Sequence, residues 1–530
     1  MSEMIRETCQ TARESVTPMT NGDAGAQAPA LTLVTPGSIS VESPWWRIAD
    51  FGVLGLWMAV VGFILPYHEK WCDEAQAWLF ARDLSLSRLW FYELRYEGSP
   101  GLWHTILWIA QHVFHANYNA LGYIGAACAV GGAALLIFKA PFPRYIRWPL
   151  AFTYFMVYQY AVIARQYNLL PVLAFAAALM FSDFRRPLRM AIVLMLLAVV
   201  SFHGTLLAGS LGLAYLVEAL PQWRTLDKQV RTRYWISIAL MVLTFVFVFI
   251  VLKPPPDSLE MTYKRGGLLR IPGYTNRQGQ IIDSSLKLTT VISGAFFDHP
   301  IPSAIFLLLA GAWCFYRRKL LVFALGVGLE IALYSLVYGT AHHHGTVFVA
   351  AITGLWVAWP SQGEQHSSSP RERWALRGMI ALLLCLCAVN IWDAAVAIKR
   401  DYLYPYSGAE DAASYLKAVG ADHGPIFGYG FGISAVQANF DHNILTNIPT
   451  SYIHNGKPPY GFQLDLAELE RVNPEYVVVF SVDPQTTMRL DDRAWVAYGY
   501  QLVHFSDGYY FYKRGIYERE AYIIYRRAHQ

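Results

Sequence analysis

The chain has 530 residues, of which 55% are hydrophobic, 15% aromatic and only 15% charged. A soluble domain of this size carries about a quarter charged residues, so the composition argues against an ordinary soluble enzyme and predicts a polytopic α-helical membrane protein. The formal net charge of +4 says little by itself, and we expect no nucleic-acid partner.

The first 45 residues are polar and rich in small side chains, which predicts a disordered cytoplasmic tail over 1–45. They contain no apolar core of the kind found in a cleaved signal peptide, so the first apolar run is expected to be an uncleaved anchor. The six cysteines show no spacing typical of a disulfide framework or a zinc site. The sequence also lacks a P-loop or Rossmann fingerprint, and we expect no metal and no cofactor.

Apolar runs that we interpret as eleven membrane spans follow along the chain. They lie at about 48–66, 119–138, 148–163, 168–181, 190–203, 205–220, 234–252, 301–315, 320–338, 346–360 and 378–394. The run 101–114 is too short to cross a bilayer and carries polar residues, so it is interpreted as a re-entrant or interfacial helix.

Five loops between these spans carry clusters of basic residues, and the alternation of spans puts all five on one side. The clusters are Lys139, Arg144 and Arg147; Arg185, Arg186 and Arg189; Arg224, Lys228, Arg231 and Arg233; Arg317, Arg318 and Lys319; and Arg371, Arg373 and Arg377. Positive charge marks the cytoplasmic side. The polar loops 67–100 and 253–300, and the chain after about 395, are then expected outside.

The region 395–530 differs in composition from the membrane module, 46–394, and predicts a small extracytoplasmic α/β domain. "AEDAASYLKAV" and "LDLAELERVN" have helical periodicity, and "PIFGYGFG" and "PEYVVVFSVD" are typical of short buried strands. "GYQLVHFSDGYYFYKR" predicts a hairpin whose turn is Asp507-Gly508.

Two adjacent carboxylates, Asp73 and Glu74, stand in "KWCDEAQAW", directly after the first span. Neighbouring residues of a helix point about 100° apart, so the two cannot serve one point symmetrically. One reading has one carboxylate facing a cavity while the other caps or pairs nearby. The other reading is a solvated helix start, where acids are favoured by the helix dipole.

Other polar residues of the outer loops are candidates for binding. Arg95 and Glu97 stand beside a Gly-Ser-Pro-Gly turn, and Arg165, Gln166 and Tyr167 lie between two spans. An arginine at that depth is costly without a partner. The partner is either a lipid phosphate, which guanidinium binds bidentately, or a carboxylate such as Glu97.

Two further stretches complete the outer surface. The loop 253–300 carries several cations, among them Arg265, and loops of this length are often lids or binding elements. "AHHHG" contains His342 and His343 without the i, i+4 spacing of a helical metal site, so a phosphate or hydroxyl partner is expected. Glu330, in the middle of a span, predicts a functional group or a buried pair.

The motifs "CDEAQAWLFARDLS" and "YEGSPGLW", the outer Arg165-Gln166-Tyr167 and the long later loop together resemble the GT-C membrane glycosyltransferases, of the protein O-mannosyltransferase and aminoarabinose transferase type. The resemblance covers about residues 48–394. It implies a sugar donor linked to polyprenyl phosphate and inverting transfer to an acceptor hydroxyl at the outer face of the cell (inner) membrane.

The resemblance also implies roles for individual residues. Asp73, with Glu74 beside it, is expected to be catalytic, and Asp73 matches the family's general base. The donor phosphate is expected to meet Arg165, His343, Arg265 and Arg95, and the acceptor pocket to hold Glu97, Tyr167, Gln166 and His342. Two other classes remain open at this point: a transporter or lipid flippase, and a scaffold that presents the C-terminal domain.

Overall fold

The computed structural model describes residues 44–97, 99–253, 255–256, 274–275, 281–282, 284–336, 341–361, 364, 369–452, 466–482 and 495–528. The expected tail 1–45 lies outside these residues except for its last two, as does half of the loop 253–300, including Arg265. Internal contacts group Ala49–Gln530 into one compact unit. The helices and the sheet lie in this unit, and α1 (Pro44–Ile64) begins just before it.

Five helices of the described chain are long and apolar enough to cross a membrane, and a bent pair adds a sixth if it counts as one span. The five are α1 (Pro44–Ile64), α6 (Ala120–Lys139), α10 (Phe202–Ala219) with the turn η4 (Leu220–Gln222), α11 (Lys228–Leu252) and α18 (Pro370–Leu403). The pair is α13 (Ser284–Ala295) and α14 (Pro300–Tyr316), bent by 75°. The chain is thus mostly helical, with five or six helices that could cross a membrane, which is consistent with a polytopic membrane protein, and the count of eleven spans is not shown.

Shorter apolar helices fill the space between the long ones. They are α8 (Leu170–Met180), α9 (Pro187–Ala198), α15 (Leu320–Leu336) and α16 (His344–Ala358). All but one residue of α16 are buried, and α16 packs against α8, α13 and α15. A helix that is apolar on every side and covered by protein on every side forms the centre of the bundle.

The stretch 148–163, expected to be one span, is broken in the structure. It contains the end of α7 (Arg144–Ala151), the π-helical turn η2 (Phe155–Gln159) and irregular chain up to the 3₁₀ turn η3 (Gln166–Leu169). Pro149 supplies no backbone N–H inside α7. Nearly all of 150–164 is buried in protein, where irregular backbone is tolerated at membrane depth.

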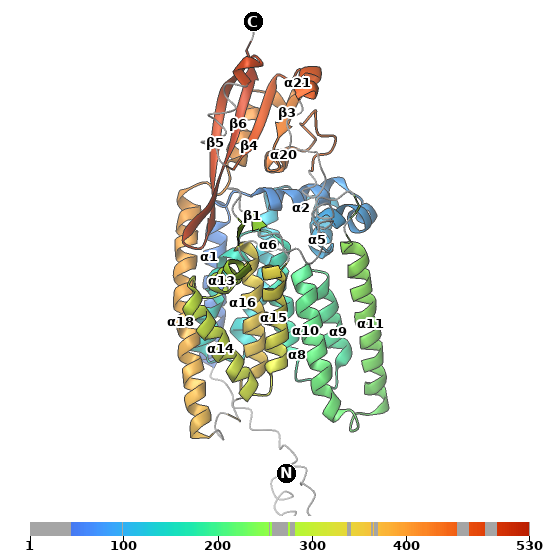
Figure 1. The fold of residues 1–530 in the computed structure, drawn as a ribbon, viewed down its shortest axis with the longest axis vertical. Helices are drawn as coiled ribbons and strands as arrows, with labels where there is room; N and C mark the ends of the chain where they lie inside the picture. The colour runs from blue at the N-terminus through green and yellow to red at the C-terminus, as the bar shows by residue number, and fades with distance from the viewer. Residues whose placement is uncertain are drawn as a thin grey trace, which may run out of the picture. The chain divides into compact units, whose positions relative to one another are not determined.

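Short helices lie at the ends of the upright helices on the side of the sheet (Figure 1). They are α2 (Cys72–Asp83), α3 (Leu86–Arg88), η1 (Leu89–Glu93), α4 (Leu94–Glu97) and α5 (Leu102–His112). The 11-residue α5 packs on α2, in agreement with the prediction that 101–114 does not span.

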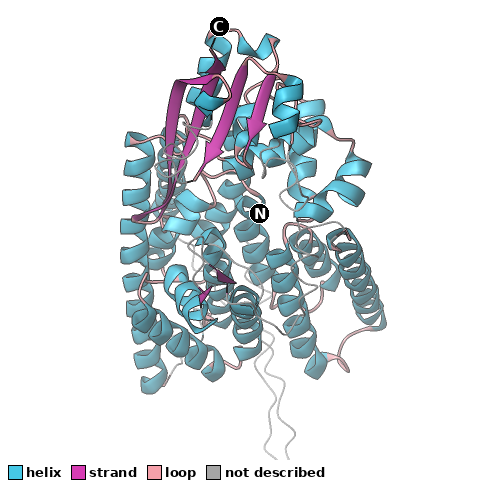
Figure 2. Cartoon of the chain, turned by 45° about the horizontal axis from the view of Figure 1, so that its top comes forward, coloured by secondary structure: helices cyan, strands magenta, loops and turns pink. Residues whose placement is uncertain are grey.

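The C-terminal region contains a four-stranded sheet in the order β3-β4-β6-β5 (Figure 2). Its strands are β3 (Ile426–Tyr429), β4 (Tyr476–Ser481), β5 (Tyr500–Tyr512) and β6 (Gly515–Arg527), and its helices are α19 (Ala409–Ala418), η6 (Ala421–His423), α20 (Ile433–Gln437) and α21 (Leu466–Val472). β3 and β4 are parallel, and the other pairs are antiparallel. A separate two-stranded ribbon pairs β1 (Tyr274–Thr275) with β2 (Ile281–Ile282).

The predicted turn of the long hairpin was wrong. Asp507 and Gly508 lie inside β5, paired with β6, and the chain reverses at Lys513, whose φ is +52°. Gly508 serves close packing instead, because a Cβ there would stand 2.6 Å from the Cα of Ser407. The helix before this region also runs further than expected, since α18 continues to Leu403 and not to 394.

The C-terminal ends of α1 and α18 lie together, on the side of the sheet. Tyr67 follows the end of α1, and Tyr402 lies in the last turn of α18. Their ring centroids are 4.7 Å apart. Near the start of α1, Asp50 pairs with the guanidinium of Arg144 at 3.2 Å. The start of α7 therefore lies at the end of the bundle opposite to the sheet.

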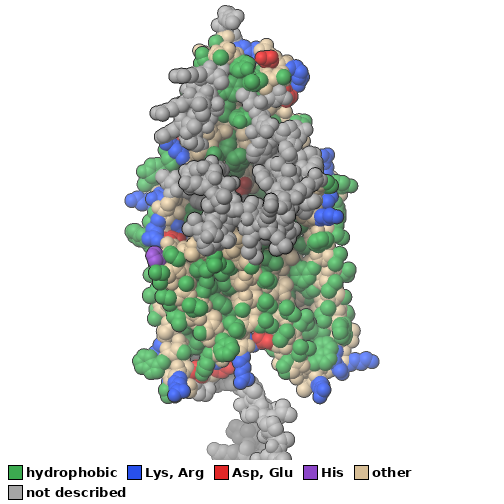
Figure 3. Space-filling model, viewed as in Figure 1, with side chains coloured by type: hydrophobic (Ala, Val, Ile, Leu, Met, Phe, Trp, Pro, Cys, Tyr) green, Lys and Arg blue, Asp and Glu red, His purple; other side chains and the backbone are tan. Residues whose placement is uncertain are grey.

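The same opposite end gathers other basic residues. Arg317 pairs at 2.9 Å with Glu372, at the start of α18, and Lys319 pairs with Glu218, near the end of α10. Figure 3 shows Lys and Arg side chains at this end, below a largely apolar belt. The structure thus separates a basic end from the end that holds α2 and the sheet.

Candidate active site

Glu74 joins the start of α2 to the loop between η2 and η3. It is the third residue of α2 and is fully buried. Its Oε1 accepts from the backbone N–H of Ala164 at 2.7 Å, and its Oε2 accepts from the N–H of Trp71 at 3.0 Å. A carboxylate at this position satisfies a free donor of the helix start. These contacts fix the orientation of α2 relative to the loop before η3.

His68 stands between Glu74 and a second buried carboxylate, Asp401. Its Nε2 lies 3.2 Å from Glu74 Oε2 and its Nδ1 lies 2.9 Å from Asp401 Oδ2, which also accepts from the hydroxyl of Tyr158 at 3.1 Å. Burial disfavours a charged imidazole, but Asp401 and Glu74 outweigh it and raise the pKa of His68 to about 10. A charged histidine thus ties α2 to α18.

The pKa of Glu74 is lowered in spite of its burial, which acts in the opposite direction. The causes are the charge and hydrogen bond of His68, and the N–H groups of Trp71 and Ala164. Glu74 is therefore an ionised residue whose described contacts are all structural. Neither oxygen faces solvent, and both accept from the protein.

Asp73, the neighbouring residue, points elsewhere, as the 100° step predicts. Its side chain is 26% exposed, and its Oδ2 lies 2.9 Å from a guanidinium nitrogen of Arg165. The arginine also lies over the ring of Tyr167, at 5.5 Å. The carboxylate paired with Arg165 is therefore Asp73, whereas Glu97 accepts from the side-chain amide of Gln76 on α2 at 3.3 Å.

The histidine turn lies next to this ion pair. It forms η5 (Ala341–His343), and the ring of His343 is 5.4 Å from that of Tyr167. Burial, followed by the charges of neighbouring groups including Arg165, lowers the pKa of His342 and of His343 well below the usual range. Both rings are therefore neutral. The two histidines can exchange hydrogen bonds with a phosphate or hydroxyl. Among His342, His343 and Arg165, only Arg165 supplies positive charge.

Behind His343 a polar network continues between the helices. The ring of His203 lies 5.2 Å from that of His343, and its Nδ1 is 2.8 Å from Glu330 Oε2. Tyr334 donates to the carbonyl of His343 at 2.9 Å, and Thr346 donates to Glu330 at 3.0 Å. The carboxylate of Glu330, on α15, thus belongs to a buried hydrogen-bonded group.

The C-terminal hairpin reaches the same place. The hydroxyl of Tyr510, on β5, contacts the imidazole of His342, and its ring is 4.7 Å from that of Trp71. Trp71 donates from its indole N–H to Glu520, on β6, at 2.9 Å. The sheet therefore adds an aromatic residue beside Trp71, at the start of the helix that carries Asp73.

Four contributors were missed from the sequence: His68, Trp71, Asp401 and Tyr510. His68 and Asp401 are 333 residues apart, and Tyr510 and His342 are 168 apart, so no local pattern joins them. The sequence predicts the hairpin, and its aromatic run "YYFY" at 509–512 is the signal that could have pointed to Tyr510.

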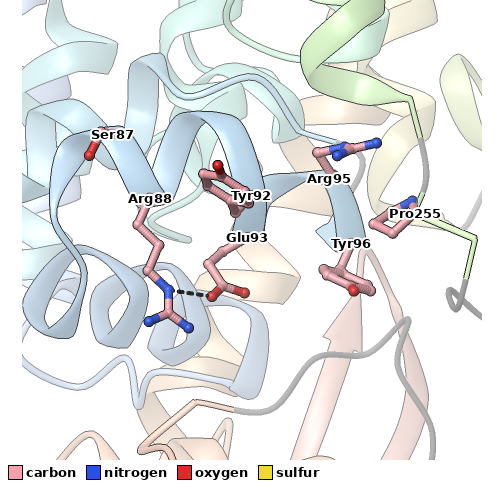
Figure 4. Close-up of a pocket in the computed structure, with 7 residues that line it drawn as sticks. All are labelled: Ser87, Arg88, Tyr92, Glu93, Arg95, Tyr96 and Pro255. Carbon is pink, nitrogen blue, oxygen red and sulfur yellow. Dashed lines mark hydrogen bonds and ion pairs between the residues drawn. The ribbon is translucent and has the colours of Figure 1, made fainter.

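The other predicted residues lie away from the ion pair or outside the described chain. Arg95 donates to the carbonyl of Lys253 at 2.9 Å and borders a separate hollow of about 480 Å³. Figure 4 shows that hollow, with Arg88 turned toward Glu93 at 2.8 Å. Gln166 is half-buried at the start of η3. Arg265 lies outside the described residues.

Asp73, Arg165, Tyr167, His342 and His343 thus form one continuous cluster. The two hollows described on this side of the molecule are lined by other residues, so an open cavity at Asp73 stays a prediction. Within the described ranges, no group of three or more His, Cys, Asp or Glu is arranged to hold a metal ion.

Comparison of the chain with protein-family models, with curated proteins and with solved structures finds no match. Its function is therefore argued from the site alone.

Proposed function

We propose that the chain is an inverting glycosyltransferase that moves a sugar from a polyprenyl-phosphate-linked donor to an acceptor hydroxyl. The observation that supports this is the partly exposed pair of Asp73 and Arg165, 2.9 Å apart, next to neutral histidines. A base and a phosphate-binding cation stand side by side at an end of the apolar helices, where a lipid-borne substrate would arrive.

Each residue has a defined task in this reaction. The carboxylate of Asp73 takes the proton of the acceptor hydroxyl, whose oxygen forms the new bond to the anomeric carbon. The bond from that carbon to the phosphate oxygen breaks on the opposite face, which inverts the configuration. The electron pair leaves with the lipid phosphate, and Arg165 stabilises the growing negative charge. His342 and His343 contribute hydrogen bonds without charge.

The proposal includes an orientation. The end with α2 and the sheet faces outward from the cell (inner) membrane, because the basic residues gather at the other end. A GT-C-like module with eleven spans, followed by an extracytoplasmic α/β domain, is part of the same proposal. The acceptor is a protein, a lipid or a glycan.

The test compares Asp73→Asn with Asp83→Asn in a deletion strain. Asp83 ends the same helix and pairs with its neighbour Arg82, so it is a matched control for loss of one carboxylate. Envelope glycans are analysed by mass spectrometry at equal protein levels. We expect a hexose- or pentose-sized mass to return with the wild type and with Asp83→Asn, and to be lost with Asp73→Asn.

Return of the mass with Asp73→Asn would exclude Asp73 as the base. A strain in which no glycan changes on deletion would contradict glycosyl transfer altogether.

One observation favours a second candidate, a transporter or lipid flippase. Glu330 and His203 form a buried pair between helices of the membrane part, and such pairs also occur in proton-coupled transport. Glu330→Gln would then stop movement of the substrate across the membrane, while Asp73→Asn would leave it unchanged. The transferase proposal expects Asp73→Asn to be the more severe change of the two.

A further inference from the structure

A second hollow, of about 470 Å³, lies where the ends of α1 and α18 meet the sheet. Four acids line it, Glu69, Asp401, Asp411 and Asp507, and none of its described lining residues is Lys, Arg or His. Three tyrosines, Tyr67, Tyr402 and Tyr404, also line it. This composition predicts a ligand with positive charge.

Two carboxylate oxygens here have no hydrogen-bond partner in the described part of the chain. One is Oδ1 of Asp401, a residue only 1% exposed, and the other is Oε2 of Glu69. Buried polar atoms are almost always satisfied, so an orphaned pair beside one hollow indicates a missing donor. The other carboxylate oxygen of Asp401, Oδ2, already has hydrogen bonds with His68 and Tyr158.

Three of the four acids already have a cationic contact in the described part of the chain. His504 contacts Asp411 and Arg519 contacts Asp507, each at 2.8 Å, and His68 contacts Asp401. Burial, with Glu410, Asp411 and Asp401 nearby, raises the pKa of Glu69 to about 8, although His68 acts in the opposite direction. A cation in the hollow would relieve this repulsion.

The walls point to the membrane interface as the source of that cation. Tyr67 and Tyr402 are each 46% exposed and Tyr404 is 53% exposed, at or just past the ends of two helices that are long enough to span. Tyrosine is typical of the level of lipid headgroups, and its ring attracts cations. An ammonium group has three N–H donors, which can reach separate carboxylate oxygens without the regular arrangement that a metal requires.

From these observations we infer that the hollow lined by Glu69, Asp401, Asp411 and Asp507 binds the primary ammonium group of a membrane lipid. The inference does not depend on the proposed transferase activity, because Asp73 and Arg165 do not line this hollow.

The test is native mass spectrometry of the purified full chain with phosphatidylethanolamine or phosphatidylglycerol of the same acyl chains. We expect phosphatidylethanolamine to be retained and phosphatidylglycerol to be lost. The double variant Glu69→Gln, Asp411→Asn should weaken retention at least about tenfold, since a hydrogen bond to a charged group is worth about that much. Asp441→Asn, an exposed acid of the same domain, is the matched control and should bind normally.

Equal retention of the two lipids by the wild type would overturn the inference, and this comparison needs no variant to fold. Displacement of phosphatidylethanolamine by millimolar Ca²⁺ but not by free ethanolamine would assign the hollow to an inorganic cation instead. If free ethanolamine bound as tightly as the lipid, the ligand would not need to be a membrane lipid, and this part of the inference would be overturned.

Discussion

At the scale of single residues, two adjacent carboxylates have opposite environments. Glu74 is fully buried and accepts two backbone N–H groups beside a charged histidine, whereas Asp73 is partly exposed and meets an arginine. The proposed transfer therefore assigns the proton of the acceptor hydroxyl to Asp73 and a structural role to Glu74. The helical step of about 100° turns one toward the protein and the other toward the cluster with Arg165.

Glu74→Gln is expected to lower the free energy of unfolding by about 3 kcal/mol or more, because it removes one charge from a buried group and leaves weaker acceptors for the N–H groups of Trp71 and Ala164. Denaturant titration of the purified protein in mixed micelles measures this. Asp83→Asn, at the exposed end of the same helix, should change it by no more than about 0.5 kcal/mol. Equal effects of the two changes would contradict the structural role of Glu74.

The charge on His68 predicts a pH dependence. Its pKa is raised from 6.5 to about 10 in the folded protein, so its contribution to stability is complete below pH 6.5 and is lost as the pH rises through 10. The pKa of Glu69 is raised from 4.5 to about 8, so ionisation of Glu69 also lowers the stability as the pH rises, but this effect is complete above about pH 8. Stability measured between pH 8 and 10 should therefore fall, and should fall less steeply in Glu74→Gln. A flat profile in the wild type would rule out a charged His68.

At the scale of elements, the hairpin of β5 and β6 extends from the sheet to the histidine turn. Tyr510 contacts His342, and Lys513, at the turn, pairs with Asp298 at 2.7 Å, before α14. Tyr512 also donates to the carbonyl of Gly294 at 3.1 Å, and Arg514 pairs with Asp393 of α18 at 2.8 Å, so the hairpin holds the C-terminal region against the helices. Docking requires close approach of β5 to the chain after α18, where Gly508 faces Ser407.

Gly508→Ala is expected to destabilise this docking by about 1–3 kcal/mol, since its Cβ would lie 2.6 Å from the Cα of Ser407. The measurement is the rate of limited proteolysis of the C-terminal region in detergent. Gly515→Ala is the control, because the nearest atom to its Cβ would be 3.7 Å away. Faster cleavage of Gly515→Ala than of Gly508→Ala would show that the close approach is not what holds the hairpin.

At the scale of the whole molecule, the structure divides charge between two ends of the helices. Arg144, Arg317 and Lys319 pair with acids at the end where α1 and α18 begin. Asp73, Arg165 and the sheet lie toward the end where these helices finish. By the positive-inside rule the sheet is expected outside the cell membrane.

Cysteine labelling tests this orientation in a background without native cysteines. A membrane-impermeant maleimide should label Val496→Cys, at an exposed residue near the sheet, in intact cells. It should label Arg224→Cys, in the exposed turn between α10 and α11, only after permeabilisation. The reverse pattern would put the sheet and Asp73 in the cytoplasm and would remove a lipid-linked donor of the outer leaflet.

Much of the fold is decided by local sequence. The apolar runs predict the long helices α1, α6, α11 and α18, and the short run at 101–114 predicts the non-spanning α5. The composition after residue 395 predicts the small sheet. Burial in lipid and burial in protein select the same apolar residues, however, so hydropathy could not reveal that 148–163 is broken and covered by other helices.

The site divides in the same way. The sequence determined that Asp73 and Glu74 diverge and that Arg165 needs a partner, because helical geometry and the cost of an isolated charge act locally. Only the tertiary structure decided that this partner is Asp73, that His68 joins Glu74 to Asp401, and that Tyr510 reaches His342. Those contacts depend on how distant segments pack, and neither composition nor periodicity records that packing.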